Sequence, residues 1–156
     1  MPRRETDVTT RSAAAAFVVN SLAAKAQSVA EIESKLARRG VPAADAASVV
    51  AEAARLGYLD DAELAGQLAR GFVSRGYGRR RAATALRRRG LPGELTNDAL
   101  DAAYGDVDEV AALARAALGS RATDDDAARR RASAFLARRG FSSAATWQAV
   151  RARSTE

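Results

Sequence analysis

The sequence of 156 residues contains no cysteine and no histidine, and aromatic residues make up only 5% of it. Without cysteine there is no disulfide, and without either residue there is no zinc site of the usual kind and no cysteine- or histidine-based catalysis. The sequence also lacks a glycine-rich nucleotide-binding loop. We therefore expect no cofactor, no bound metal and no enzymatic activity.

Long apolar runs are also missing. A membrane-spanning helix takes about 20 apolar residues, and the apolar stretch from Ala13 to Val19 is far shorter. This stretch lacks the layout of a signal peptide, so we expect it to be part of a core helix. The absence of cysteine agrees with a reducing compartment. We expect a monomeric cytoplasmic protein that makes no membrane contact.

The charge of the chain is strongly one-sided. There are 25 basic residues against 19 acidic ones, and all the basic ones are arginine except Lys25 and Lys35. A net charge of +6 favours an anionic partner, either nucleic acid or an acidic protein surface. Hydrophobic residues make up 47% of the chain. Many of them are alanine, which buries little area and predicts a thin core with close helix contacts.

An internal repeat organises the chain. Leu36-Ala37-Arg38-Arg39-Gly40-Val41 recurs fifty residues later as Leu86-Arg87-Arg88-Arg89-Gly90-Leu91, and again as Leu136-Ala137-Arg138-Arg139-Gly140-Phe141. Three copies in register, each with an apolar residue after the glycine, point to tandem structural units.

Helix start and stop signals divide each unit into three helices. Ser28 and Glu31 have the spacing of a capping box, and Asp60, Ser142 and the run Asp124–Asp126 are placed to cap further helices. The glycine of each repeated motif can close a helix in the left-handed conformation. No segment alternates as a strand does. We therefore predict an all-α protein of three tandem three-helix repeats forming an elongated curved body, with a flexible tail at 1–10 and repeats at 11–57, 58–105 and 106–156.

The middle helix of the second repeat is the most basic part of the chain. The stretch 76–90 reads GYGRRRAATALRRRG and contains no acidic residue. At about 100° per residue, Arg80, Thr84 and Arg87 share one face, while Ala82, Ala85 and Leu86 face the core. Two interpretations stay open: the face binds an anionic partner, or it is a solvated surface compensated by acids such as Asp60, Asp61 and Glu94.

The remaining charged and aromatic positions have structural interpretations that we prefer. Arg38-Arg39 and Arg138-Arg139 end helices, where positive charge offsets the helix dipole. Arg129–Arg131 follow Asp124–Asp126 by about a turn, which predicts mutual neutralisation. Tyr58, Tyr77 and Tyr104 lie near turns, where packing is favoured over stacking on bases. We expect Phe135, Phe141 and Trp147 to be core residues of the third repeat.

Taken together, these motifs resemble the RecX family, which regulates the bacterial RecA recombinase. The resemblance rests on Gly57–Ala62, on Gly76-Tyr77-Gly78 followed by Arg81 and Leu86, and on the three repeated motifs. It spans nearly the whole chain from Ser12. The resemblance implies a protein that lies in the groove of the RecA–DNA filament, reduces its ATP hydrolysis and strand exchange, and favours its disassembly.

Two candidate functions follow from the sequence. The first is a regulator that binds the RecA–DNA filament and reaches single- or double-stranded DNA directly or through it. The alternative is a general nucleic-acid-binding helical module. For either, the partner-binding residues we predict are Arg79, Arg80, Arg81, Arg87 and Arg88, with Arg75, Tyr77, Arg38 and Arg138.

Overall fold

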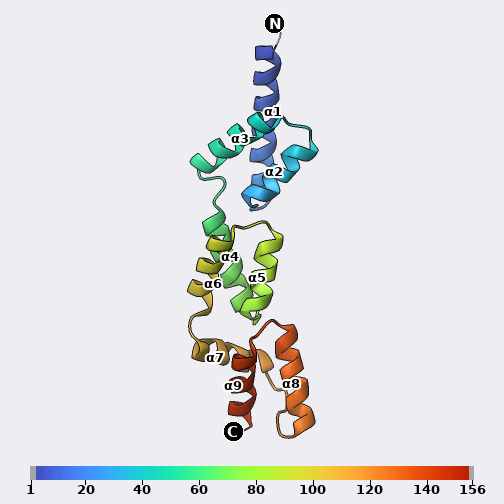
Figure 1. Ribbon diagram of the computed structural model, residues 1–156, viewed down its shortest axis with the longest axis vertical. Coiled ribbons are helices and arrows are strands. Elements are labelled where there is room, and N and C mark those ends of the chain that lie inside the picture. Colours follow the sequence, from blue (N-terminus) through green and yellow to red (C-terminus); the bar gives the residue numbers. More distant parts are fainter. Residues whose placement is uncertain (1–2, 155–156) are drawn as a thin grey trace. The chain divides into compact units, whose positions relative to one another are not determined.

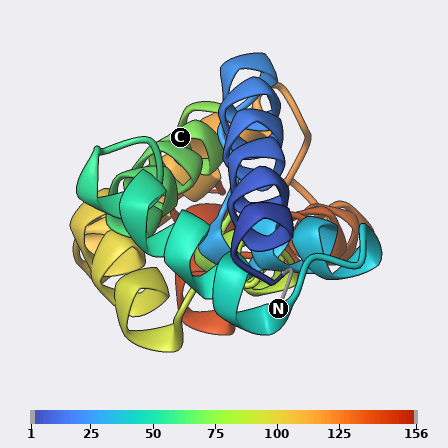
Figure 2. The same ribbon diagram turned by 90° about the horizontal axis from the view of Figure 1, so that it is seen from above.

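The structure is a computed structural model that describes residues 3–154, with side chains from residue 10 to residue 154. Within that range the chain is helical and contains no strand (Figures 1 and 2). The all-α fold predicted from the sequence is therefore confirmed. The helices of the described residues are α1 (Arg3–Ala24), α2 (Val29–Arg38), α3 (Ala43–Arg55), α4 (Asp61–Ser74), α5 (Arg79–Arg88), α6 (Gly93–Tyr104), α7 (Val107–Leu118), α8 (Asp126–Arg138) and α9 (Ser143–Arg153).

The predicted caps account for where several helices begin. At α2 the N–H of Glu31 donates to Ser28 Oγ at 3.1 Å, and the N–H of Ser28 donates to Glu31 Oε2 at 2.9 Å, so the capping box is confirmed. The side chains of Asp60, Asp125 and Ser142 each accept a hydrogen bond from the backbone N–H three residues further on. These bonds satisfy N–H groups that have no partner within the helix. At Asp125 this bond lowers the pKa of the carboxyl.

The first helix begins earlier than the sequence pattern indicates. The sequence pattern predicts a flexible tail at 1–10 and a first repeat from residue 11, whereas α1 begins at Arg3. No glycine or proline lies between Arg3 and Lys25, so nothing in the sequence interrupts a helix there. Residues 1 and 2 of the expected tail lie outside the described residues.

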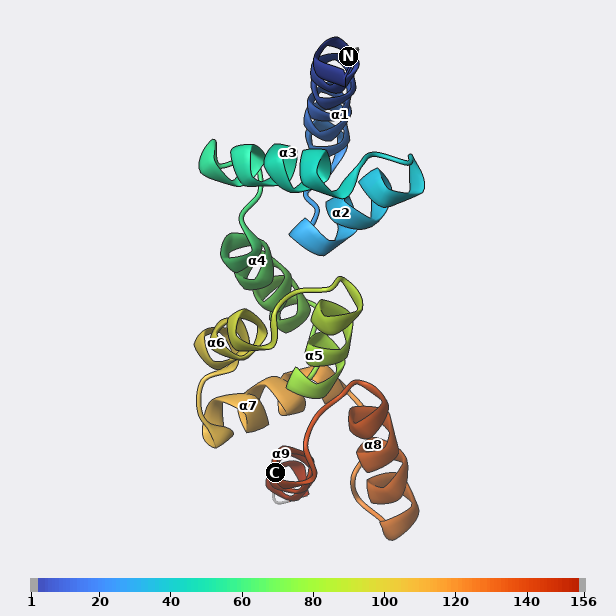
Figure 3. The same cartoon turned by 45° about the horizontal axis from the view of Figure 1, so that its top comes forward.

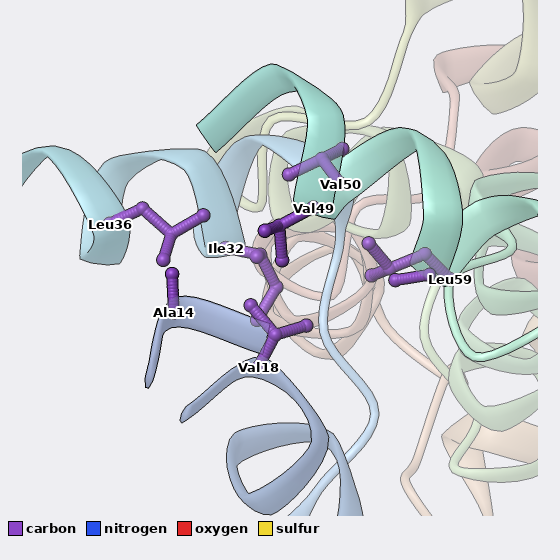
Figure 4. Close-up of a cluster of buried hydrophobic side chains, with 8 residues drawn as sticks. Ala14, Val18, Ile32, Leu36, Val49, Val50 and Leu59 are labelled. Carbon is purple, nitrogen blue, oxygen red and sulfur yellow. The ribbon is translucent and has the colours of Figure 1, made fainter. Parts of the chain in front are cut away.

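Each set of three consecutive helices has its own hydrophobic core. In the first set, α3 packs against both α1 and α2 (Figure 3), and Val18, Ile32 and Leu36 are at most 1% exposed in its core (Figure 4). The second core lies among α4, α5 and α6, and the third among α7, α8 and α9. Alanines hold many of the most deeply buried positions: Ala65, Ala69, Ala82, Ala114, Ala132 and Ala149 are at most 2% exposed. This is the thin, closely packed core that the composition predicts.

Contacts divide the chain into two compact units. The first comprises the residues up to Leu64 together with Arg89–Pro92, and the second comprises Ala65–Arg88 together with the residues from Gly93 on. The division falls within α4, and the segment that follows α5 belongs to the first unit. The repeat boundaries expected near residues 57 and 105 stay a prediction.

In the first unit, Arg89 of the repeated motif is bound to the turn before α2. Its guanidinium donates to both carboxylate oxygens of Glu31, at 2.9 and 2.7 Å, and to the carbonyl of Ala26 at 2.8 Å. The hydroxyl of Ser28 donates to the carbonyl of Arg89 at 2.5 Å. The hydrogen bond from Arg89 is the main reason why the pKa of Glu31 is lowered.

In the second unit, Arg139 makes equivalent contacts with the turn before α5. Its guanidinium donates to the carbonyls of Gly76 and Arg75 at 2.8 and 2.6 Å, and the N–H of Gly78 donates to the carbonyl of Arg139 at 2.8 Å. Arg139 also lies 4.4 Å from the ring centroid of Tyr77. We call each of these two sets of contacts, one around Arg89 and one around Arg139, a clasp.

The two clasps explain the fifty-residue repeat. Residues 26, 28 and 89 of the first correspond to 76, 78 and 139 of the second, so the same turn accepts the same arginine at the same spacing. In the first motif the guanidinium of Arg39 instead lies 4.1 Å from the ring centroid of Phe17. The arginine just before the glycine of each motif therefore has a structural role through direct contacts. For Arg39 and Arg139 the sequence pattern had indicated an effect of the helix dipole.

The large aromatic residues are only partly where we expected them. Phe141 is 2% exposed and Phe135 packs against the third core, as predicted, but Trp147 is 60% exposed. The prediction that Trp147 is a core residue is therefore wrong. The inner face of α9 is made instead of Ala145, Thr146, Ala149 and Val150.

The three tyrosines differ in how deeply they are buried. Tyr104 is 4% exposed, and its hydroxyl donates to the carbonyl of Tyr77 at 2.8 Å. Burial raises the pKa of Tyr104 to about 12. Tyr77 is partly buried between arginines, whereas Tyr58 is 57% exposed. The packing prediction is wrong for Tyr58 because its neighbour Leu59 takes the buried position at this turn.

Candidate functional site

Helix α5 presents its arginines opposite a narrow apolar seam. Ala82 and Leu86 are buried, as the periodicity predicts for the core-facing side. The third buried residue is Ala83, whereas Ala85, which we expected there, is only partly buried. Gly78, just before the helix, packs so closely against the chain that an added Cβ would lie 2.3 Å from the N of Phe141. This close approach and the Arg139 clasp fix the start of α5. The basic side chains from Arg79 onward therefore extend from a helix whose start is held in place.

A cleft of about 540 Å³ runs beside this helix within the second unit. From α5 it is lined by Arg79, Arg80, Thr84 and Arg87. The start of α7 and the turn into α9 form the other wall. The remaining residues that line the cleft are Ala83, Gly105, Asp106, Val107, Val110, Gly140, Ser142 and Ala145. Arg80, Thr84 and Arg87, which the helical period places on one face, thus all border the cleft. The opposite wall contributes apolar side chains, from Val107, Val110 and Ala145.

Two of the arginines at this cleft carry uncompensated charge. Arg80 and Arg87 are exposed, and neither forms an ion pair within the described part of the chain. Arg79 does, since its guanidinium lies 2.7 Å from a carboxylate oxygen of Asp101. Compensation by nearby acids therefore applies to Arg79, through a residue that sequence reasoning missed. Guanidinium groups without a partner bind carboxylates and phosphates well.

The other arginines predicted on this surface lie beside the cleft. Arg81 stacks 4.5 Å from the ring centroid of Tyr77, and Arg88 is exposed at the end of α5. Arg75 lies 4.8 Å from the ring centroid of Phe72. Tyr77 is covered by Arg81 and by Arg139, so its ring serves packing in this structure.

Arg38 and Arg138 are not among the residues that line the cleft. Arg38 is exposed in the last turn of α2, in the first unit. Arg138 is exposed on α8 and lines a separate hollow of about 470 Å³ together with Arg121, Arg131 and Phe135. Of the nine predicted contact residues, the structure gathers Arg79, Arg80 and Arg87 at one cleft. For all nine, contact with a partner stays a prediction.

Sequence reasoning missed the second wall of the cleft. Asp106 and Ser142 carried a local signal as helix caps, and both do cap helices. Val107 carried no signal, although its side chain is 53% exposed at the cleft. Their convergence with α5 depends on packing between segments far apart in the chain, which periodicity does not reveal.

No group of three or more acidic side chains among the described residues is placed to hold a metal ion. None of the helices in residues 3–154 combines the length and the apolar character needed to cross a bilayer.

Three-helix units, with a basic cleft beside α5, define a helical-repeat protein. Family models identify the repeats: residues 60–100 match the second three-helix domain of RecX, and residues 106–150 match the third. The chain is 36% identical to the regulatory protein RecX of Deinococcus radiodurans, over 96% of this chain and 73% of that protein. It is 38% identical to the regulatory protein RecX of Stenotrophomonas maltophilia, over 71% of this chain and 69% of that protein. The chain belongs to the RecX family of regulatory proteins.

Solved structures share the fold. The crystal structure of RecX from Lactobacillus salivarius matches with a TM-score of 0.81 over 95% of this chain and 98% of that one, at 18% sequence identity. A second crystal structure of a regulatory protein RecX matches with a TM-score of 0.78 over 92% of this chain and 73% of that one, at 17% identity. At such low identity these similarities establish the fold alone.

Proposed function

We propose that this protein binds the filament of RecA recombinase on DNA and negatively modulates it, reducing ATP hydrolysis, strand exchange and filament growth. Its relatives are named regulatory protein RecX, and the sequence motifs resemble a family that regulates this recombinase. The protein would act in the cytoplasm, where the recombinase works.

The observation that carries the proposal is the α5 cleft. Arg80 and Arg87 lack ion-pair partners among the described residues and stand on a helix fixed by the clasp at Arg139. Val107, Ala83 and Ala145 add apolar lining. A protein surface uses both features, because association buries apolar side chains inside a polar rim. The carboxylates of a recombinase surface would pair with the arginines.

The mechanism we propose is steric and electrostatic. Tandem repeats offer successive surfaces along one chain, which suits contact with successive subunits of a filament. A protein that spans neighbouring subunits blocks the groove between them and disfavours the arrangement needed for ATP hydrolysis. The basic residues also raise the rate of encounter with an anionic filament, an effect that salt weakens.

The test is charge reversal at the cleft. We expect Arg80→Glu with Arg87→Glu to weaken binding to preformed recombinase–DNA filaments by about tenfold or more, because each change replaces an attraction with a repulsion. The matched control is Lys25→Glu with Arg130→Glu, two exposed basic residues outside the cleft that form no ion pair within the described residues and give the same change in net charge. Binding is measured by co-sedimentation, and far-UV circular dichroism checks the helix content. A folded cleft variant that binds as tightly as its control would remove this face from the site.

A general nucleic-acid-binding module is the alternative, favoured by the second arginine-lined hollow at Arg121, Arg131 and Arg138. It predicts tight binding to bare DNA, with an affinity that falls steeply as salt rises because counterions are released. It also predicts that filaments compete no better than the DNA they contain. Titration of both ligands at two salt concentrations separates the two functions.

A further inference from the structure

The one tryptophan of the sequence lies exposed in a groove of its own. The groove, of about 480 Å³, is formed between α7 and α9 within the second unit and shares no lining residue with the α5 cleft. From α9 it is lined by Trp147, Gln148, Arg151 and Ala152, and from α7 by Asp108, Ala111 and Arg115. An indole left 60% exposed between two packed helices contributes little to the core.

Charge and aromatic character coincide at this groove. The guanidinium of Arg151, one helical turn after Trp147, lies 4.9 Å from the indole ring. Arg115 is exposed on the facing helix, and neither arginine forms an ion pair within the described residues. Asp108 is the acidic residue among the lining side chains. The groove thus offers two guanidinium groups against one carboxylate.

The composition of the groove favours a nucleotide over a protein segment. A protein docking site needs a contiguous apolar centre inside a polar rim, whereas here the one large apolar side chain is Trp147, with small alanines beside it. A nucleotide of a single strand needs an aromatic plane for its base and a cation for its phosphate. Trp147 and Arg115 provide these, and the amide of Gln148 is available to the edge of a base.

We infer that the α7–α9 groove binds single-stranded nucleic acid, with one base stacked on Trp147 and the backbone phosphate at Arg115. Arg151 borders the same base, since arginine stacks on planar groups as well as pairing with anions. This activity goes beyond filament binding through α5 and does not depend on the recombinase. It would hold a displaced or uncovered strand while the arginines of α5 contact another surface.

The experiment uses the full chain and an oligothymidine, without recombinase. Because the sequence has one tryptophan, its emission reports on the groove alone, and we expect the oligonucleotide to quench it. A duplex with its bases paired should quench far less. With a labelled oligonucleotide, Trp147→Ala should bind about tenfold more weakly, since stacking of one base contributes that much. Trp147→Phe should restore most of the affinity.

Matched variants make the outcome decisive. Tyr58→Ala removes another aromatic side chain that is 57% exposed, in the first unit, and should leave oligonucleotide binding unchanged. Arg115→Ala should reduce the salt dependence by about one phosphate contact. Unquenched emission from a protein with oligonucleotide bound, or wild-type affinity in a folded Trp147→Ala variant, would overturn the inference. Equal quenching by an acidic polypeptide such as polyglutamate would also overturn it, because the groove would then select carboxylates.

Discussion

The close approach at the second clasp can be tested by adding one methyl group. A Cβ at Gly140, where φ is +91°, would lie 2.5 Å from the backbone N and 2.6 Å from the Cβ of Arg81. Gly40 occupies the same position of the first motif with φ +73°, and an added Cβ there would meet nothing within 4 Å. Gly140→Ala and Gly40→Ala therefore share a backbone penalty, while the contact penalty applies to Gly140→Ala alone.

The magnitudes follow from these two contributions. A left-handed alanine costs about 1–2 kcal/mol, partly offset by about 0.4–1 kcal/mol from the less flexible unfolded chain. Overpacking against backbone adds about 1–3 kcal/mol. We expect Gly40→Ala to lower the free energy of unfolding by about 1 kcal/mol and Gly140→Ala by about 3 kcal/mol. For a chain of this size that difference lowers the melting temperature of Gly140→Ala by about 4–8 °C relative to Gly40→Ala.

The assay is thermal and urea unfolding of both variants, followed by far-UV circular dichroism. Each variant is compared with the wild type at one protein concentration and one salt concentration. If the two alanine variants lost the same stability, the Gly140 turn would not lie against Arg81, and the account of the repeated motif would fail.

Two further predictions concern other buried contacts. The hydrogen bond from Arg89 lowers the pKa of Glu31 below its ordinary value of 4.5, so the stability from this pair is present above that pH and is lost as the pH falls through the folded-state pKa. Glu31→Gln should therefore lower the free energy of unfolding by about 1 kcal/mol at pH 7. In urea titrations at low pH the variant and the wild type should be equally stable. A difference in stability that stays constant with pH would contradict the ion pair. Tyr104→Phe should cost about 1–2 kcal/mol, because the carbonyl of Tyr77 loses its donor, and should abolish an ultraviolet tyrosinate transition at about pH 12. An unchanged transition in that variant would mean that another tyrosine produces it.

Local features of this protein were predictable from its sequence. The caps at Ser28, Asp125 and Ser142, and the apolar seam of α5, depend on residues within a turn or two of each other. The fifty-residue repeat indicated three helical units because each repeat carries the same stop signal. Arg80, Thr84 and Arg87 were placed together because one helix fixes their relative positions.

Features that depend on distant segments were not predictable. The ion pair of Arg79 with Asp101 joins two helices across the second core, and the wall at Asp106 and Val107 is set by how α7 packs. Trp147 was expected in the core, yet α9 packs through Ala145, Thr146, Ala149 and Val150. Arg139 was assigned to the helix dipole because the carbonyls that it binds, at Arg75 and Gly76, lie in another repeat.

The central proposal, that this protein restrains the recombinase filament through the α5 cleft, is tested most directly by ATP hydrolysis. The rate of hydrolysis by RecA on single-stranded DNA is measured as the wild-type protein is titrated in, beside the variant with Arg80→Glu and Arg87→Glu. We predict inhibition by the wild type and its loss in the variant. Undiminished hydrolysis at saturating wild-type protein, together with binding to bare DNA that the variant with Arg80→Glu and Arg87→Glu loses, would contradict the proposal and make α5 a DNA-binding element.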